Sequence, residues 1–293
     1  MFISGYVMEE VIIVNDSKFA DLKRMFKDGG SERIHVLADF DRTLTKTFYK
    51  SEKAGSIISY LRKEKGKYLT EDYSDRAHAL FDKYHPIEID GSISQDEKNK
   101  KMYEWWKKHK ELLIECGLDK QTIKRCVIEM IEEDALVFRK GVDKFFRLLE
   151  NQDIPLVIIT ASLGDLVKGF MEQKNELKKN VHVIGNTFKF DKNGKTIGIE
   201  KIVHVFNKNE FSTEGLEVHD ELLERKNVIL LGDSLGDLGM VEGFEYENLI
   251  KIGFLNENVE ENLEEYKKAY DVLILNDGDF EFVNDLIKEI FGD

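Results

Sequence analysis

The fold of this chain is decided by the stretch Ile34-His35-Val36-Leu37-Ala38-Asp39-Phe40-Asp41-Arg42-Thr43-Leu44-Thr45. The apolar run that begins it is typical of a buried strand in a parallel sheet. It ends in Asp39 and Asp41, whose side chains leave an extended chain on the same side. Because ligands collect at the carboxyl ends of strands in open α/β sheets, the stretch also predicts where the chemistry takes place.

Two carboxylates this close together repel each other unless a cation lies beside them. Mg²⁺ suits such a place because it prefers oxygen ligands and needs few of them from the protein. A plainer interpretation is that Asp39 and Asp41 cap the turn or helix that follows. We favour the Mg²⁺ site because three further motifs follow in a fixed order.

The composition limits the partners of the chain. Its 293 residues suffice for one α/β domain and a smaller inserted one. A net charge of −14 argues against a general nucleic-acid or anionic-membrane binder, because both need basic surface. No apolar run approaches the length of a membrane span, residues 1–15 lack the basic start of a signal peptide, and the two cysteines form no disulfide or zinc pattern. We therefore expect a cytoplasmic monomer without nucleic-acid or membrane partners.

Short apolar strands alternate with helices along most of the chain. We expect strands at 34–38, 154–159, 181–184, 228–231, 250–253 and 272–275, and helices at 16–27, 141–150, 163–176 and 259–269. A hairpin is expected over 187–199, around Asn193-Gly194. The repeated β-α-β order predicts an α/β fold with a doubly wound, mostly parallel sheet.

Residues 46–140 interrupt this order. They are heavily charged and carry apolar residues at helical spacing, with helices expected over 96–117 and 121–131. An insert of this length between the first two strands is too long for an ordinary crossover. We therefore expect a helical cap domain of residues 46–140 over the strand ends, and a catalytic core of residues 1–45 and 141–293.

Each of the three further motifs has a plain and a functional interpretation. Thr160 follows an apolar strand just before a helix, where it either caps the helix or helps to cradle a phosphate. Lys208 is either an ordinary surface lysine or the cation that balances clustered carboxylates. Asp233 and Asp237 follow another apolar strand, in the segment Gly232-Asp233-Ser234-Leu235-Gly236-Asp237, where the glycines allow close backbone approach.

Taken in order, the motifs D-x-D-x-T, strand-end threonine, lysine and G-D-x-x-G-D resemble those of the haloacid dehalogenase (HAD) superfamily of phosphotransferases. Further segments resemble the cytosolic type III (pyrimidine) 5′-nucleotidases: Pro86-Ile87-Glu88-Ile89-Asp90, Glu104-Trp105-Trp106, Phe206-Asn207-Lys208, Val228-Ile229-Leu230-Leu231-Gly232-Asp233-Ser234 and Ile252-Gly253-Phe254-Leu255-Asn256. The resemblance extends over nearly the whole chain. It implies a HAD-like Rossmannoid core and Mg²⁺-dependent hydrolysis of nucleoside 5′-monophosphates to nucleoside and phosphate.

The resemblance also implies roles for the residues at the matching positions. Asp39 would attack phosphorus to form an aspartyl-phosphate, and Asp41 would protonate the leaving oxygen and then activate water. Thr160, the Ala161 amide and Lys208 would hold the phosphoryl group.

The metal site is implied in the same way. Asp233 would complete the Mg²⁺ coordination begun by the Asp39 carboxylate and the Asp41 carbonyl oxygen. Asp237 would bind Lys208 or the metal-bound waters, and not the ion itself, and so hold them in place.

In the expected cap, the resemblance implies that Glu88 accepts hydrogen bonds from the base and that Trp105 or Trp106 stacks on it. Either tryptophan can instead belong to the core of the cap. His109 stands where family members often carry a serine, so the choice between CMP or UMP and a 7-methylguanosine monophosphate stays open. Phosphotransfer to a nucleoside also stays open, as does a non-catalytic nucleotide-binding role.

Overall fold

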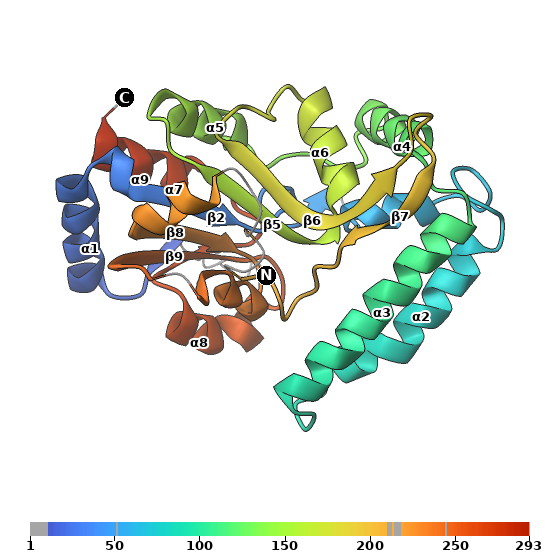
Figure 1. Cartoon of the computed structure of the whole chain (residues 1–293). Coiled ribbons are helices and arrows are strands. Elements are labelled where there is room, and N and C mark those ends of the chain that lie inside the picture. Colours follow the sequence, from blue (N-terminus) through green and yellow to red (C-terminus); the bar gives the residue numbers. More distant parts are fainter. Residues whose placement is uncertain (1–10, 51, 210–212, 214–217, 244, 293) are drawn as a thin grey trace, which may run out of the picture.

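The computed structural model describes residues 11–50, 52–209, 213, 218–243 and 245–292. Most of residues 1–15, which enter the signal-peptide prediction, therefore lie outside the described residues. The core is an eight-stranded sheet with helices on both faces (Figure 1). In spatial order its strands are β1 (Val11–Ile13), β10 (Val272–Leu275), β9 (Asn248–Leu255), β8 (Asn227–Gly232), β2 (Ile34–Ala38), β5 (Leu156–Leu163), β6 (Val181–Phe190) and β7 (Thr196–Lys201).

The sheet is parallel from β10 through β6, and only its two edge strands, β1 and β7, run antiparallel to their neighbours. This confirms the predicted doubly wound, mostly parallel sheet. Alternate residues of the central strands enter different apolar layers: Val36 packs in one, and Leu37 packs in the other. A strand buried on both faces explains why β2 is apolar at every position except His35, whose Nδ1 pairs with the carbonyl of Arg225.

Two layers of helices cover the sheet. Apolar side chains of α1 (Asp16–Gly29), α5 (Val142–Asn151), α6 (Gly164–Gln173) and α9 (Glu281–Phe291) share one apolar cluster with the strands. Side chains of α7 (His219–Glu224), α8 (Val259–Ala269) and the 3₁₀ helix Leu235–Val241 join the other. None of the helices in the described part of the chain combines the length and the apolarity needed to cross a membrane.

Strand β6 is longer than its prediction. We predicted a strand at 181–184 and a hairpin over 187–199. Both are present, but β6 runs without interruption from Val181 to Phe190 and so joins the predicted strand to the first arm of the hairpin, while β7 forms the second arm. The prediction left residues 185 and 186 outside both elements, because polar Asn186 is atypical of a buried strand; it is fully buried in mid-strand, where its side-chain amide donates to backbone carbonyls. The turn at Asn193-Gly194 is present, with Gly194 at a φ of 83°.

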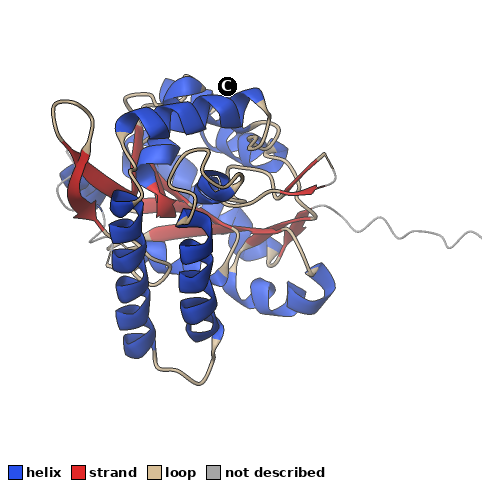
Figure 2. Cartoon of the chain, turned by 90° about the vertical axis from the view of Figure 1, so that its right-hand side faces the viewer, coloured by secondary structure: helices blue, strands red, loops and turns tan. Residues whose placement is uncertain are grey.

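The predicted insert has two parts. Helices α2 (Tyr73–Ile89) and α3 (Gln95–Glu115) lie side by side and project from the body as a hairpin, which we call the cap arm (Figures 1 and 2). The remainder comprises the short strands β3 (Phe48–Tyr49) and β4 (Glu52–Lys53), the 3₁₀ helix Ile57–Arg62, and α4 (Lys120–Glu132). Helix α4 packs against α6 and shares the apolar cluster of the core. That residues 46–140 form a separate domain stays a prediction.

Candidate active site

The order of strands in the sheet brings the D-x-D-x-T motif, which follows β2, next to the G-D-x-x-G-D motif, which follows β8. Strand β2 lies between β5 and β8, and Ala38 at its end is paired with Ile158 and Leu231. The next residue, Asp39, donates its backbone N–H to the carbonyl of Leu231 at 3.0 Å. Asp39 therefore leaves β2 beside the end of β8, which Asp233 follows.

Lys208 enters this position from a distant segment. Its ammonium group contacts the Asp39 carboxylate and lies 3.0 Å from Asp237 Oδ1. Each of the three side chains is less than 10% exposed. Burial alone would lower the pKa of Lys208, but the charges of Asp237 and Asp39 outweigh burial and raise it. The lysine is therefore charged and held between two carboxylates.

Asp237 organises the turn in front of it. Its Oδ2 accepts hydrogen bonds from the backbone N–H groups of Asp233 and Ser234 and from the Ser234 hydroxyl, at 2.9 to 3.1 Å. A Cβ atom on Gly232 would lie 2.5 Å from the Cβ of Asp237, so only glycine fits at the end of β8. These contacts give the G-D-x-x-G-D motif its physical basis.

Three carboxylates at this edge form a cluster that fits a cation. One oxygen atom from each of Asp39, Asp233 and Asp237 lies within 4.8 Å of the others. Burial, followed by the charge of Asp237, raises the pKa of Asp233 to about 7. Burial also raises the pKa of Asp39, against the opposing charge of Lys208. One lysine does not balance three clustered carboxylates, and oxygen donors are the ligands that Mg²⁺ prefers.

Asp41 is held apart from this cluster. Its Oδ1 accepts the backbone N–H of Ile57 at 2.8 Å. Burial raises the pKa of Asp41 to about 6, although the hydrogen bond from Ile57 opposes this change. Such a carboxyl group can both give and take a proton near neutral pH.

Arg139 is a residue of the site that the sequence analysis missed. Its buried guanidinium donates to the carbonyls of Arg42 and Thr43 and to Asn256 Oδ1, and it forms an ion pair of 3.0 Å with Asp277. It thereby fixes the turn that follows Asp41, where Arg42 has a φ of 63°. No motif around Arg139 in the sequence indicated this role.

Thr160 and Ala161 follow Ile158, the residue of β5 that pairs with Ala38, and they lie within the strand and not at its end. We predicted a strand over 154–159 and a helix from residue 163. Helix α6 begins at Gly164, as expected within one residue, but β5 continues to Leu163 after a register shift that begins at Ile159. The Thr160 hydroxyl accepts the N–H of Ser162 at 3.0 Å. The Asn186 amide donates to the carbonyls of Ala161 and Ser162 at 2.9 and 3.1 Å, and so holds this segment from behind.

Glu88 and Trp105 lie on the cap arm, where their neighbours are side chains of the same two helices. Glu88 is about 22% exposed, and its Oε2 lies 3.1 Å from His85 Nδ1. Trp105 stacks on Tyr84, with ring centroids 5.9 Å apart, and contacts Phe81 edge to face. Both residues retain exposed surface from which to contact a ligand.

Trp106 and His109 lie deeper in the arm. Their rings stack at 5.5 Å, and His109 Nε2 pairs with the Tyr73 hydroxyl at 3.0 Å. Burial lowers the pKa of His109 to about 3, so the ring is neutral at physiological pH. Trp106 packs against the apolar cluster, as the core interpretation of one tryptophan predicts.

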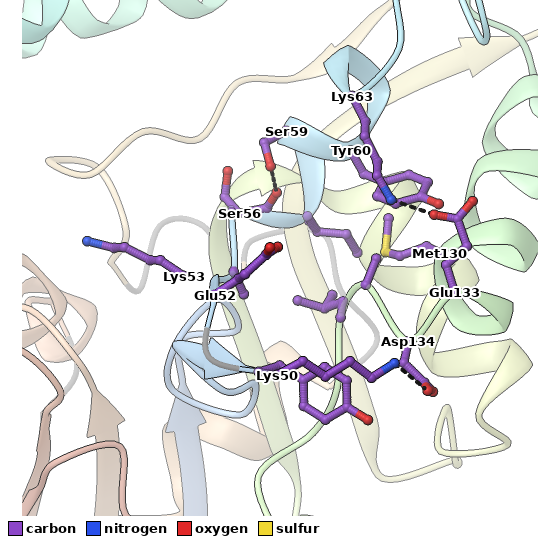
Figure 3. Close-up of a pocket in the computed structure, with 16 residues that line it drawn as sticks. Lys50, Glu52, Lys53, Ser56, Ser59, Tyr60, Lys63, Met130, Glu133 and Asp134 are labelled. Atoms are coloured by element: carbon purple, nitrogen blue, oxygen red, sulfur yellow. Dashed lines mark hydrogen bonds and ion pairs between the residues drawn. The ribbon is translucent and has the colours of Figure 1, made fainter.

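A pocket of about 430 Å³ lies on the side of the insert (Figure 3). It is formed by β3, β4, the 3₁₀ helix Ile57–Arg62 and the end of α4, and ion pairs Lys63–Glu133 and Lys50–Asp134 lie along it. None of the predicted site residues lines it, although its wall includes Ile57, which binds Asp41. The pocket is therefore adjacent to the candidate site and separate from it.

The chain is similar to known proteins over most of its length. A family model described as "Pyrimidine 5′-nucleotidase (UMPH-1)" matches residues 42–291. The mouse 7-methylguanosine phosphate-specific 5′-nucleotidase is 32% identical over 290 residues, which cover 98% of this chain and 95% of the relative. The 7-methylguanosine phosphate-specific 5′-nucleotidase A of Xenopus laevis is 34% identical over 262 residues, covering 89% and 88%.

Solved structures show the same similarity. A crystal structure of cytosolic 5′-nucleotidase IIIB bound to cytidine matches with a TM-score of 0.85 at 30% identity, covering 97% of this chain and 94% of that one. A HAD family hydrolase from Salmonella enterica matches with a TM-score of 0.52 at 15% identity, covering 93% and 80%. The second similarity concerns the fold alone.

Proposed function

The chain belongs to the pyrimidine 5′-nucleotidase (UMPH-1) family and is a 5′-nucleotidase, and we propose that it hydrolyses nucleoside 5′-monophosphates through an aspartyl-phosphate on Asp39 with the help of Mg²⁺. One observation carries the proposal. Three segments that are distant in sequence place Asp39, Lys208 and the Asp233–Asp237 turn in one buried, hydrogen-bonded cluster. A nucleophile, a cation and a metal-ligand set in one place are what phosphoryl transfer needs.

In the first half of the reaction, an oxygen of Asp39 bonds to phosphorus while the bond from phosphorus to the nucleoside 5′-oxygen breaks. Asp41 gives its proton to that leaving oxygen. Because burial raises the pKa of Asp41 to about 6, part of it carries the required proton near neutral pH. Lys208 offsets negative charge on both the phosphoryl group and Asp39.

In the second half, Asp41 takes a proton from water as the water oxygen bonds to phosphorus. The bond between phosphorus and Asp39 breaks, and phosphate leaves. Thr160 and the Ala161 amide hold the phosphoryl oxygens through both halves. Asn186, which binds the Ala161 carbonyl, keeps this segment in place.

The residues present fit Mg²⁺. The carboxylates of Asp39 and Asp233, with the carbonyl oxygen of Asp41, would hold the ion, which when bound offsets charge on the phosphoryl oxygens. Asp237 has both carboxylate oxygens engaged, by Lys208 and by the turn at 233–234, and so it positions the site.

The cap arm would select the base. We propose CMP and UMP as substrates, with Glu88 accepting hydrogen bonds from the base and Trp105 stacking on it. The second candidate is 7-methylguanosine monophosphate, since the curated relatives described above are named for it. His109 would act from inside the arm, because its contacts are to Tyr73 and Trp106. Cytoplasmic location and a monomeric state stay predictions.

Phosphate release from CMP, UMP and 7-methylguanosine monophosphate, with and without Mg²⁺, tests the proposal. Asp39→Asn is expected to abolish release and keep the fold, while Asp285→Asn, an exposed position on α9, keeps full activity. Turnover by Asp39→Asn would refute nucleophilic catalysis by Asp39. Adding a nucleoside and looking for a new nucleotide separates phosphotransfer from hydrolysis.

A further inference from the structure

Lys110 is a buried cation on the cap arm. It lies on α3, yet its side chain is completely buried against the core. Its Nζ donates to the carbonyl of Thr187 at 2.6 Å and to the carbonyl of Lys201. Thr187 and Lys201 are partners in the β6–β7 ladder. A single ammonium group therefore ties the arm to both strands of this hairpin at the point where β7 ends.

The surroundings of Lys110 are unusual for a lysine. Its Nζ lies 4.7 Å from the centroid of the Phe188 ring, and it takes part in no ion pair among the described residues. Burial lowers its pKa to about 8, against the opposing charges of Asp165 on α6 and Glu200 on β7. Removing a charged ammonium group from water costs free energy, and the two carbonyl acceptors, the Phe188 ring and the charges of Asp165 and Glu200 offset this cost only in part, because the pKa is still lowered. Stability by itself therefore does not explain this lysine.

The chain that leaves Lys201 leads to the catalytic lysine. On the core side, Asn186 holds Val203 by two hydrogen bonds: its Oδ1 accepts the N–H of Val203 at 3.1 Å, and its Nδ2 donates to the carbonyl of Val203 at 2.7 Å. On the arm side, Lys98 Nζ lies 5.7 Å from the centroid of the Phe206 ring. We call residues 201–208 the connecting segment.

The arm thus touches the connecting segment at two places. Lys98 and Lys110 are separated along α3 by about 18 Å, at a rise of about 1.5 Å per residue. Lys110 contacts the start of the connecting segment, and Lys98 contacts Phe206, two residues before Lys208. Because Asn186 holds the connecting segment from the core independently, losing the contact at Lys110 should release the arm and leave Lys208 in place.

We propose that Lys110 is a positioning residue that sets the cap arm over the phosphate site and thereby lets the enzyme prefer nucleotides to simple phosphate esters. The inference rests on the proposed function, since it assumes that the arm contacts the nucleoside. Within the part of the chain that the structure describes, Lys110 contacts Thr187, Phe188 and Lys201, none of which is a proposed site residue, so it acts through the orientation of α3.

Two substrates distinguish a role of Lys110 in nucleotide preference from a role in supporting the whole site. Steady-state phosphate release is measured with CMP and with methyl phosphate, which has no nucleoside for the arm to contact. Lys110→Met is expected to raise KM for CMP about tenfold or more, because small misplacements of binding groups are costly. Its kcat/KM for methyl phosphate should stay within about twofold of the original. Lys107→Met, an exposed lysine on the same helix, is the matched control and should change neither.

The outcomes are decisive in each direction. An equal loss on both substrates would show that Lys110 supports the whole site and would overturn the inference, as would unchanged KM for CMP. If Lys110→Met does not fold, Lys98→Ala decides, because Lys98 is only half-buried and makes the arm's contact with Phe206. A smaller rise in KM confined to CMP supports the inference, and no rise overturns it. If the original enzyme hydrolyses methyl phosphate as efficiently as it hydrolyses every nucleotide, that result contradicts the proposed function instead.

Discussion

The buried cluster of Asp39, Lys208, Asp233 and Asp237 and the cap arm are built differently. In the cluster, Asp39, Lys208 and Asp237 come from distant segments, are almost fully buried, and bind one another directly. On the arm, Glu88 and Trp105 keep exposed surface and contact side chains of the same two helices. A cluster held by the whole fold should treat every phosphate ester alike, while the arm can vary with the leaving group. Chemistry and selectivity should therefore be separable by mutation.

The largest effect should come from removing the cation of the cluster. Lys208→Met is expected to lower kcat/KM by about 10³-fold for CMP and methyl phosphate alike, because the charge on Asp39 and the phosphoryl group is no longer offset. Without Mg²⁺ the variant should also unfold at a lower temperature, since three clustered carboxylates lose their partner. Added Mg²⁺ should restore part of that loss. A defect confined to CMP would erase the distinction between the two regions.

A smaller effect is expected at Asp233. Asp233→Asn should raise the Mg²⁺ concentration needed for half-maximal activity by about 10- to 100-fold, because the site loses one anionic ligand. Phosphate release measured over a Mg²⁺ titration checks this, with Asp285→Asn as the control. An unchanged titration curve would remove Asp233 from the metal site.

On the arm, Glu88→Gln should change selectivity and spare the chemistry. The amide keeps the size of the side chain but replaces one acceptor oxygen by a donor, so kcat/KM values for CMP, UMP and 7-methylguanosine monophosphate should shift relative to one another by about tenfold. Methyl phosphate should be unaffected. Glu111→Gln, at an exposed position on α3, controls for the loss of charge. Equal losses on all four substrates would place Glu88 in the catalytic machinery.

The smallest effect concerns stability, and here the two regions should behave alike. Burial lowers the pKa of His109 on the arm to about 3 and that of His35 in β2 to about 4. In the unfolded chain both histidines bind a proton below about pH 6.5. The free energy of unfolding therefore has its full value above about pH 6.5 and decreases as the pH is lowered further. By pH 5 each histidine should account for a loss of about 2 kcal/mol.

Urea unfolding between pH 7 and 5 checks this. His109→Gln and His35→Gln should each make the decline with pH shallower by about the amount that histidine contributes. A decline as steep as in the original protein would mean that the substituted histidine is protonated in the folded state.

Much of the cluster could be predicted because its parts follow strands. In a parallel sheet neighbouring strands end at one edge, so the motifs after β2 and β8 meet wherever those strands are paired. The proximity of Asp39 and Asp233 could be predicted from this rule alone. Lys208 does not follow a strand directly, and only the similarity of the ordered motifs to a known family indicated its place.

The supporting residues could not be predicted. Arg139, Asn186 and Lys110 are polar residues buried by tertiary packing, and their partners are mostly backbone carbonyls. A carbonyl is present at every position, so such pairings leave no pattern in the sequence. The same reason explains why β6 was divided in two: the polar Asn186 favours a break until its buried partners are known.

The central claim is that Asp39 carries the phosphoryl group, and trapping that group tests it most directly. The enzyme is quenched in acid during turnover of a nucleoside monophosphate with Mg²⁺, digested, and examined by mass spectrometry. We predict one phosphoryl group on the peptide that contains Asp39, and none on that peptide from Asp39→Asn. A phosphoryl group on another residue, or turnover without any labelled peptide, would contradict the account.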